Sequence, residues 1–293
     1  MGDPDTAKSR GHDGAQAPEA LRVGTRIVTH QRPHLDEVVG IWLLTTFEPA
    51  CKDFSLEFIP YFGTAPVGDN VVTLGIGGGK YDEHHLKEAG TSATELIFND
   101  LMHRGLIPND GHEVKALEWL VQFATNEDNA VGYGHNDELR SFHIANIVRS
   151  HRDRTNSDEA AIRFGMEIIS DVMVELNARA AFLKEWESRI EFDTKWGKGV
   201  AVATDYGRSV AFAYSHGFVL WVNTHLSEKI SSLKGAPTSD VDLTAAYTAA
   251  AQLEPTSWYL HQSKKMLISS VDPSTGRIPT SLTLQQLIEL VKN

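Results

Sequence analysis

The stretch Thr29-His30-Gln31-Arg32-Pro33-His34-Leu35-Asp36-Glu37 directly follows the apolar run Arg26-Ile27-Val28. The apolar run predicts a short strand, and the helical apolar pattern of residues 37–44 predicts a helix after the loop. Imidazole and carboxylate side chains therefore gather in one loop at the carboxyl end of a strand, where α/β proteins build their binding sites. Together these side chains suit Mn²⁺, Fe²⁺, Co²⁺ or Zn²⁺.

Two further polar clusters follow in the sequence. Tyr81-Asp82-Glu83-His84-His85 comes after a predicted strand at residues 70–74 and the glycine-rich turn Gly75-Ile76-Gly77-Gly78-Gly79. Asn126-Glu127-Asp128-Asn129 ends a predicted helix that begins near residue 113. Each cluster alone is typical of a solvated loop or helix end, but three of them at the ends of predicted elements favour a metal site.

The remaining pattern predicts two domains. A strand at residues 54–61, a helix at 92–102 and a long helix from Ser157 towards Trp186 complete a strand–helix alternation, which is typical of a parallel sheet. Beyond residue 190 the pattern changes to β runs at 199–203, 209–214, 218–222, 257–260 and 265–270, and a closing helix at 283–291. We therefore predict an α/β protein with a parallel sheet flanked by helices and a smaller C-terminal mixed α/β domain.

The expected boundaries are a disordered tail at residues 1–20, a metal-binding domain at 21–188 and a substrate-binding domain at 189–293, with the substrate in the cleft between the two domains. No apolar run approaches the about 18–20 residues that span a bilayer. The single cysteine, Cys51, excludes an internal disulfide framework. A cytoplasmic location without membrane contact is the simplest interpretation, and the sequence leaves a homodimer open.

The charge of the chain limits the partners that it can hold. The net charge is −12, whereas proteins that grip long nucleic acids usually carry an excess of basic residues. A small phosphorylated substrate or a short oligonucleotide remains compatible, because a metal ion can supply the attraction. Arg149 and Arg152 lie in a locally basic segment that either clamps phosphates or forms a solvated connection. Trp258-Tyr259, beside His261, is a weaker candidate for stacking a base.

The order of these motifs resembles the DHH phosphoesterase superfamily, and within it most closely the family of the melanocyte proliferating gene product, a group of metal-dependent hydrolases and exonucleases. That family begins with a Thr-His…Phe-His-x-Asp-Glu loop, which matches Thr29-His30…Pro33-His34-Leu35-Asp36-Glu37. Its Asp-Val-Gly-Gly, Asp-His-His and Asp-Asn-Gly motifs match Gly75-Ile76-Gly77-Gly78, Glu83-His84-His85 and Asp128-Asn129-Ala130. Order and spacing fit from residue 26 to about 185, and the C-terminal part fits more loosely.

The resemblance implies a metal-dependent phosphoesterase, exonuclease-like, that hydrolyses a phosphodiester in nucleotides or short single-stranded oligonucleotides. It implies one or two ions of Mn²⁺ or another divalent cation, held by His30, His34, Asp36, His84 and Asp128. His85 and Asp36 would be catalytic, and Arg149, Arg152 and His261 would bind substrate. Because the ligands lie in loops, we expect Asp36→Ala or His34→Ala to abolish turnover without unfolding the protein.

One departure from the family pattern affects the metal count. Gly75 stands where the superfamily has an aspartate that bridges two metals. The chain could therefore bind one ion, or use Asp82, Glu83 or a substrate phosphate as the bridge. A non-catalytic nucleotide- or metal-binding relative is the alternative function. If the backbone at Gly75 accepts a side chain, Gly75→Asp should raise the metal content; if its φ is positive, the substitution should strain the turn.

Overall fold

The computed structural model describes residues 24–86, 90–108, 111–131, 137–228 and 230–292, so the predicted N-terminal tail lies outside the described residues. The first sheet has three parallel strands in the order β2-β1-β3. The central strand β1 (Thr25–His30) pairs with β2 (Phe54–Ile59) and with β3 (Val71–Thr73). Because the strands are parallel, their carboxyl ends share one edge, and the loops that follow β1 and β3 meet there.

Helices pack with this sheet into one core. The long ones are α1 (Leu35–Phe47), α2 (Ala93–His103), α3 (Gly111–Asp128), α5 (Ile144–Thr155) and α6 (Asp158–Trp186). α1 contacts α2, α3 and α6, and the shared core includes Ile27, Leu43, Ile97, Leu120 and Ile162. The shorter elements are α4 (Asp137–Arg140) and the 3₁₀ turns η1 (Pro49–Cys51) and η2 (Glu83–His85).

The second sheet is mixed and has the order β4-β5-β6-β7-β9-β8. Its strands are β4 (Ile190–Thr194), β5 (Gly197–Ala203), β6 (Leu220–Thr224), β7 (Ser231–Gly235), β8 (Trp258–Leu260) and β9 (Met266–Ser269). Helices α7 (Ser209–Ser215), α8 (Thr244–Leu253) and α9 (Leu284–Glu289) accompany it. The predicted fold class is confirmed: a parallel sheet with helices and a second, mixed α/β unit.

Several predicted elements were wrong or missing in the C-terminal part. Residues 209–214 form helix α7 and not a strand. Ala213 of this helix belongs to a buried cluster with Phe182 and Trp186 of α6, so packing against α6 decides the conformation of this short apolar run. Strands β4 and β7 and helix α8 had not been predicted.

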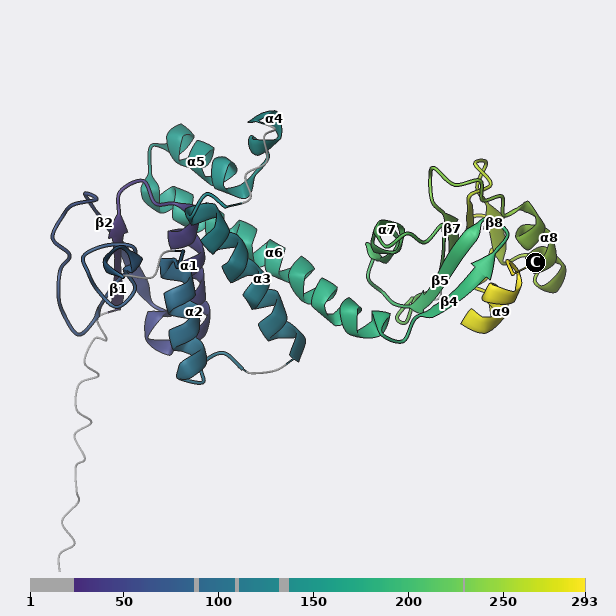
Figure 1. Ribbon diagram of the computed structural model, residues 1–293, viewed down its shortest axis with the longest axis horizontal. Helices are drawn as coiled ribbons and strands as arrows, with labels where there is room; N and C mark the ends of the chain where they lie inside the picture. Colours follow the sequence, from purple (N-terminus) through teal and green to yellow (C-terminus); the bar gives the residue numbers. More distant parts are fainter. Residues whose placement is uncertain (1–23, 87–89, 109–110, 132–136, 229, 293) are drawn as a thin grey trace, which may run out of the picture.

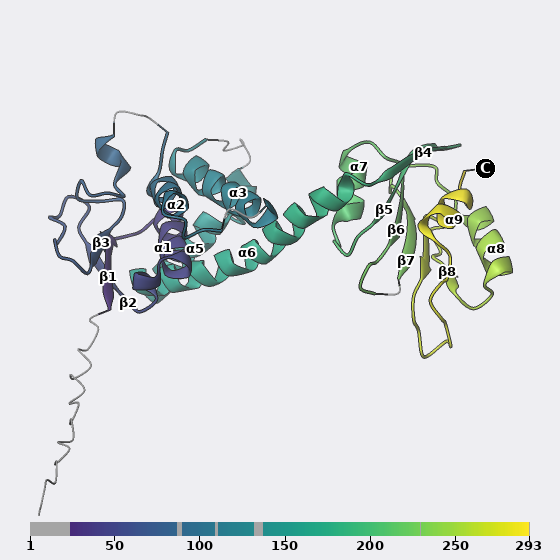
Figure 2. The same ribbon diagram turned by 90° about the horizontal axis from the view of Figure 1, so that it is seen from below.

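The two sheets lie at opposite ends of α6 (Figures 1 and 2). α6 has 29 residues and is therefore about 44 Å long at about 1.5 Å per residue. α6 ends at Trp186 and β4 begins at Ile190, close to the proposed division at 188/189. Within the described residues, none of the helices combines the length and apolarity needed to cross a membrane.

The crossing of α6 over α1 depends on a glycine. Gly165 is buried, and a Cβ there would lie 2.6 Å from Val38 Cγ1 and 3.3 Å from Val148 Cγ2. We expect Gly165→Leu to lower the free energy of unfolding by about 1–3 kcal/mol, because the helices must move apart. Urea denaturation measures this, with Ala178→Leu on the exposed face of the same helix as the control. Equal stability of the two variants would contradict the packing described here.

Candidate metal centre

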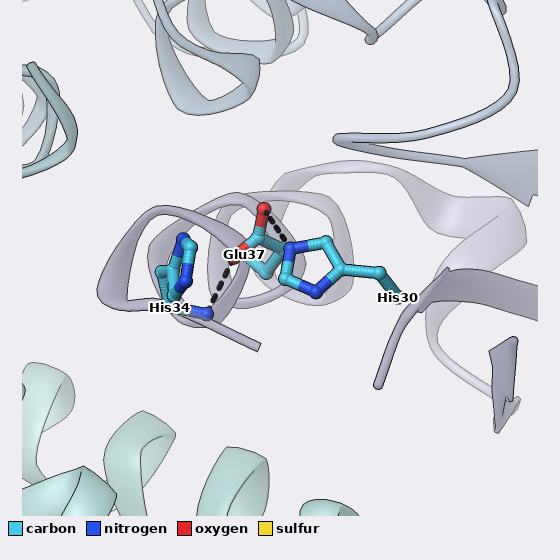
Figure 3. A group of neighbouring side chains, drawn as sticks. All are labelled: His30, His34 and Glu37. Carbon is cyan, nitrogen blue, oxygen red and sulfur yellow. Dashed lines mark hydrogen bonds and ion pairs between the residues drawn. The ribbon is translucent and has the colours of Figure 1, made fainter. Parts of the chain in front are cut away.

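Glu37 ties the end of β1 to the start of α1. Its side chain is buried, and its Oε1 lies 3.2 Å from His30 Nε2 (Figure 3). Its Oε2 accepts a hydrogen bond of 2.6 Å from the backbone N–H of His34, the residue that precedes α1. The other ring nitrogen of His30 lies 2.7 Å from the Gln31 carbonyl oxygen. The His30, His34 and Glu37 side chains each place a donor atom within 4.8 Å of the other two; we call these three the histidine group.

Glu37 also fills the space above the glycine turn that follows β3. Gly75 has a φ of +65°, and a Cβ there would lie 2.5 Å from Glu37 Oε1. A side chain at position 75 would therefore displace Glu37 and strain the turn. Of the two outcomes expected for Gly75→Asp, the geometry supports strain and not a gain of metal. The carboxylate that the sequence motif lacks at position 75 has a counterpart in Glu37, which the sequence analysis had not named as a ligand.

Asp36 points the other way, to the beginning of α2. It is buried, with 1% of its surface exposed, and its oxygens accept hydrogen bonds of 3.0 and 3.1 Å from the N–H groups of Ala93 and Thr94. The positive end of α2 stabilises this carboxylate. Asp36→Ala would leave buried N–H groups unsatisfied, at a cost of about 1–3 kcal/mol each. The expectation that Asp36 contributes little to the fold is therefore wrong.

Three carboxylates from separate segments form a second group. Asp36 of α1, Glu83 of η2 and Asp128 at the end of α3 each place an oxygen within 4.8 Å of the other two; we call them the carboxylate group. Glu83 Oε2 is buried and has no hydrogen-bond partner among the described residues. An unpartnered buried oxygen among like charges fits a site for a cation.

The pKa values in the carboxylate group show the same crowding. Burial, and then the charges of Glu37 and Asp128, raise the pKa of Asp36 to about 8. Desolvation is also the main reason why the pKa of Glu83 and the pKa of Asp128 are raised. Each carboxylate thus resists ionisation until positive charge arrives. The oxygen and imidazole donors of the two groups suit Mn²⁺, Fe²⁺ or Zn²⁺, and the carboxylates alone also suit Mg²⁺.

The structure brings together four of the five predicted ligands. His30 and His34 belong to the histidine group, and Asp36 and Asp128 to the carboxylate group. The fifth, His84, lies with Asp82 and Glu83 instead. Glu83 was named only as an alternative bridge, and it is the residue of η2 that reaches the carboxylate group.

His84 is held at both of its ring nitrogens. Nδ1 lies 2.8 Å from Asp82 Oδ1, and Nε2 lies 2.6 Å from the Tyr61 hydroxyl. Burial lowers the pKa of His84, but the hydrogen bond with Asp82 and the charge of Glu83 outweigh it, so the pKa is raised. His85 is exposed beside it on η2 and belongs to neither group.

A cavity of 450 Å³ opens beside these groups. His34, Asp36 and Asp128 line it, together with three arginines: the two predicted, Arg149 and Arg152, and a third, Arg32. Its size suits one small ligand. The cavity puts cationic side chains next to the candidate metal ligands, as recognition of a phosphate requires.

The three arginines differ in their surroundings. Among the described residues, Arg32 and Arg149 have no carboxylate within ion-pair distance, whereas Arg152 pairs with Asp153. Arg32 has a φ of +58°, and its N–H donates to Asp158 Oδ2 at the start of α6. No local pattern in the sequence signals this role, because the residue before a proline is usually extended.

His261 does not join the site. It belongs to the C-terminal sheet region, where its Nδ1 lies 2.9 Å from Ser263 Oγ. β8, which ends just before it, lies at the opposite end of α6 from β1 (Figure 1). The residues that line the arginine cavity all come from positions 32–161, so the substrate site expected between the two domains lies within the first domain. The continuous helix α6 is the physical reason for the separation.

No protein-family model matches the sequence, and no curated protein matches it. Among solved structures, the chain is similar to RecJ from Thermus thermophilus in complex with Mg²⁺, with 17% identity, a TM-score of 0.27, and coverage of 88% of this chain and 48% of that chain. It is also similar to exonuclease RecJ bound to manganese, with 15% identity, a TM-score of 0.28, and coverage of 94% and 91%. The chain thus spans about half the length of the first RecJ structure. Likeness at this level assigns neither a family nor an activity.

We expect Glu37→Gln to weaken binding of Mn²⁺ by about 10-fold to 100-fold, because it removes a negative charge that both the histidine group and the carboxylate group adjoin. The amide keeps the size of the side chain and can still accept from the His34 N–H. Isothermal titration calorimetry measures the affinity, with Glu95→Gln on α2 as the control. Unchanged affinity in Glu37→Gln would show that this carboxylate does not serve the metal.

The stability of the metal-free protein should fall as the pH rises. The pKa of Asp36 is raised from 3.8 to about 8, and that of His30 from 6.5 to about 9, mainly through its hydrogen bond and charge interaction with Glu37, which outweigh burial. A raised pKa in the folded state contributes stability that is present at low pH and lost as the pH approaches that value. Mn²⁺ should replace the departing protons.

The increase in Tm that Mn²⁺ causes should therefore grow between about pH 6 and pH 8.5. Glu37 and Asp82 have lowered pKa values and titrate below this window, so they do not oppose the trend. Differential scanning fluorimetry in Mn²⁺ and in chelator gives the comparison. A shift that is largest at the acidic end would contradict the proton–metal exchange.

Proposed function

We propose that this chain is a metal-dependent phosphoesterase that hydrolyses a phosphodiester in nucleotides or short single-stranded oligonucleotides. One observation carries the proposal: the two donor groups, drawn from three distant segments, lie beside a cavity lined by Arg32, Arg149 and Arg152. The order of the sequence motifs, which resembles the DHH phosphoesterases, supports the same activity.

The residues divide the chemistry between them. A bound divalent cation would activate a water molecule and neutralise charge on the phosphoryl oxygens. The carboxylate group would hold it, with His30, His34 and Glu37 as further donors. Arg149 and Arg32, which have no carboxylate partner among the described residues, would bind and orient the phosphate. His85, exposed on η2, would contact the phosphate from the other side.

The proposed substrate is small because the attraction for phosphate is local. The net charge of −12 opposes a long polyanion, whereas one cavity of 450 Å³ with three arginines can hold a terminal nucleotide. We further propose Mn²⁺ as the working ion, a cytoplasmic location, and a C-terminal domain that contacts longer substrates. A homodimer remains compatible with this proposal.

A non-catalytic nucleotide- or metal-binding relative is the second candidate function. The observation that favours it is Gly75, which offers no side chain to a metal, together with the use of both Asp36 oxygens by α2. Such a protein would keep the arginine cavity and bind a nucleotide without hydrolysing it. The two functions therefore differ in turnover and not in binding.

The decisive assay is release of mononucleotide from a short single-stranded oligonucleotide in Mn²⁺. We expect Asp128→Asn to lower kcat by at least about 100-fold, the upper end of what loss of an outer-shell partner costs. Stability should change little, since Asp128 is exposed at the end of α3, and Asp171→Asn on the exposed face of α6 is the control. A wild-type protein that binds the oligonucleotide but never cleaves it would favour the non-catalytic function.

A further inference from the structure

An exposed aromatic pair lies in the loop between β2 and β3. Phe62 is 96% exposed, and its ring meets that of Tyr61 edge to face, with 5.1 Å between the centroids. Tyr61 is itself 43% exposed. Neither ring contributes to the core of the domain, so the packing of the fold does not explain them.

The pair continues a row of rings that begins at the arginine cavity. The centroids of His34 and His30 are 5.1 Å apart, and those of His30 and Tyr61 are 5.2 Å apart. The Tyr61 hydroxyl also lies 2.6 Å from His84 Nε2. Phe62 is therefore one ring away from the candidate metal ligands, at the far end of a row whose other end, His34, lines the arginine cavity.

The loop that carries the pair is seated on the glycine turn of the site. Gly63 N–H donates to the Pro60 carbonyl across a tight turn of 2.6 Å. Ala65 packs where Gly77 has no side chain: a Cβ on Gly77 would lie 2.4 Å from that of Ala65, and Gly77 has a φ of +83°. These contacts hold Phe62 in a fixed relation to the site, which a stacking surface needs.

We propose that Phe62, supported by Tyr61, stacks a nucleobase of the substrate while the neighbouring phosphate lies at the donor groups. An exposed flat apolar ring next to a phosphate site is what single-stranded nucleic acids use as a stacking platform. The inference rests on the proposed function and adds to it a base-bearing substrate, since a phosphorylated metabolite without an aromatic ring would gain nothing from Phe62.

The test compares two ligands that differ only in their bases. A phosphorothioate-linked deoxyadenosine dinucleotide and its abasic analogue are titrated calorimetrically in Mn²⁺ into wild type, Phe62→Ala, Phe62→Trp and Tyr259→Ala. We expect Phe62→Ala to weaken binding of the adenine ligand by about tenfold or more and to leave the abasic ligand unaffected. Phe62→Trp should keep the binding, and Tyr259→Ala, an exposed aromatic residue of the C-terminal domain, should behave as wild type.

The outcomes separate the inference from the proposed function. Equal losses for both ligands, or no loss in Phe62→Ala, would overturn the stacking role. A change in elution volume on gel filtration without a change in affinity would also overturn it and make the pair a contact between copies. Base-dependent binding without any cleavage of the corresponding phosphodiester would sink the phosphoesterase and leave the stacking platform standing.

Discussion

Two adjacent carboxylates, Asp36 and Glu37, are buried in the first turn of α1, and the surrounding segments are arranged to stabilise them. Burying charge is costly unless hydrogen bonds and opposite charges compensate. The N-terminus of α2 compensates Asp36, and His30 together with the His34 N–H compensates Glu37. The ends of β1, α1 and α2 are thereby fixed to one another. The turn after β3 must then be glycine at position 75 to leave room for Glu37.

The compensation of this pair is incomplete, and the site lies where it fails. Asp36 faces Glu83 and Asp128 as well as α2, and the crowding raises its pKa to about 8. Positive charge is thus favoured at one point on the edge of the sheet. The arginine cavity adjoins this point, and the row of rings that ends in the Tyr61–Phe62 pair starts from it. A ligand with a phosphate and an aromatic base matches both features.

Local sequence patterns predicted the elements that carry the first domain. The strands at the end of which the motifs lie, the Ser92 cap of α2, and the convergence of His30, His34, Asp36 and Asp128 follow from periodicity and from parallel topology. Glu37 was not predicted as a donor, because a glutamate three residues after a helix start is already explained as a cap. Its second role depends on β3 and Gly75, which are far away in the sequence. Arg32 and Phe62 were missed for the same reason: each is a single loop residue whose neighbours are set by tertiary contacts.

The C-terminal domain shows the limit of local patterns more plainly. β7 contains Ser231, Ser232 and Gly235, a composition that does not indicate a strand, yet it lies between β6 and β9 with its serines buried. His261 was assigned to the site from nearby aromatic residues, whereas α6 holds it at the other end of the molecule. Long-range geometry of this kind has no signature in a window of a few residues.

The central claim is that a divalent cation belongs among the carboxylates of Asp36, Glu83 and Asp128. The most direct measurement is anomalous diffraction from crystals grown in Mn²⁺. The account predicts an anomalous peak bounded by these three carboxylates, next to the histidine group. Manganese bound only at other surface carboxylates, with the three side chains still in contact with one another and free of metal, would contradict it.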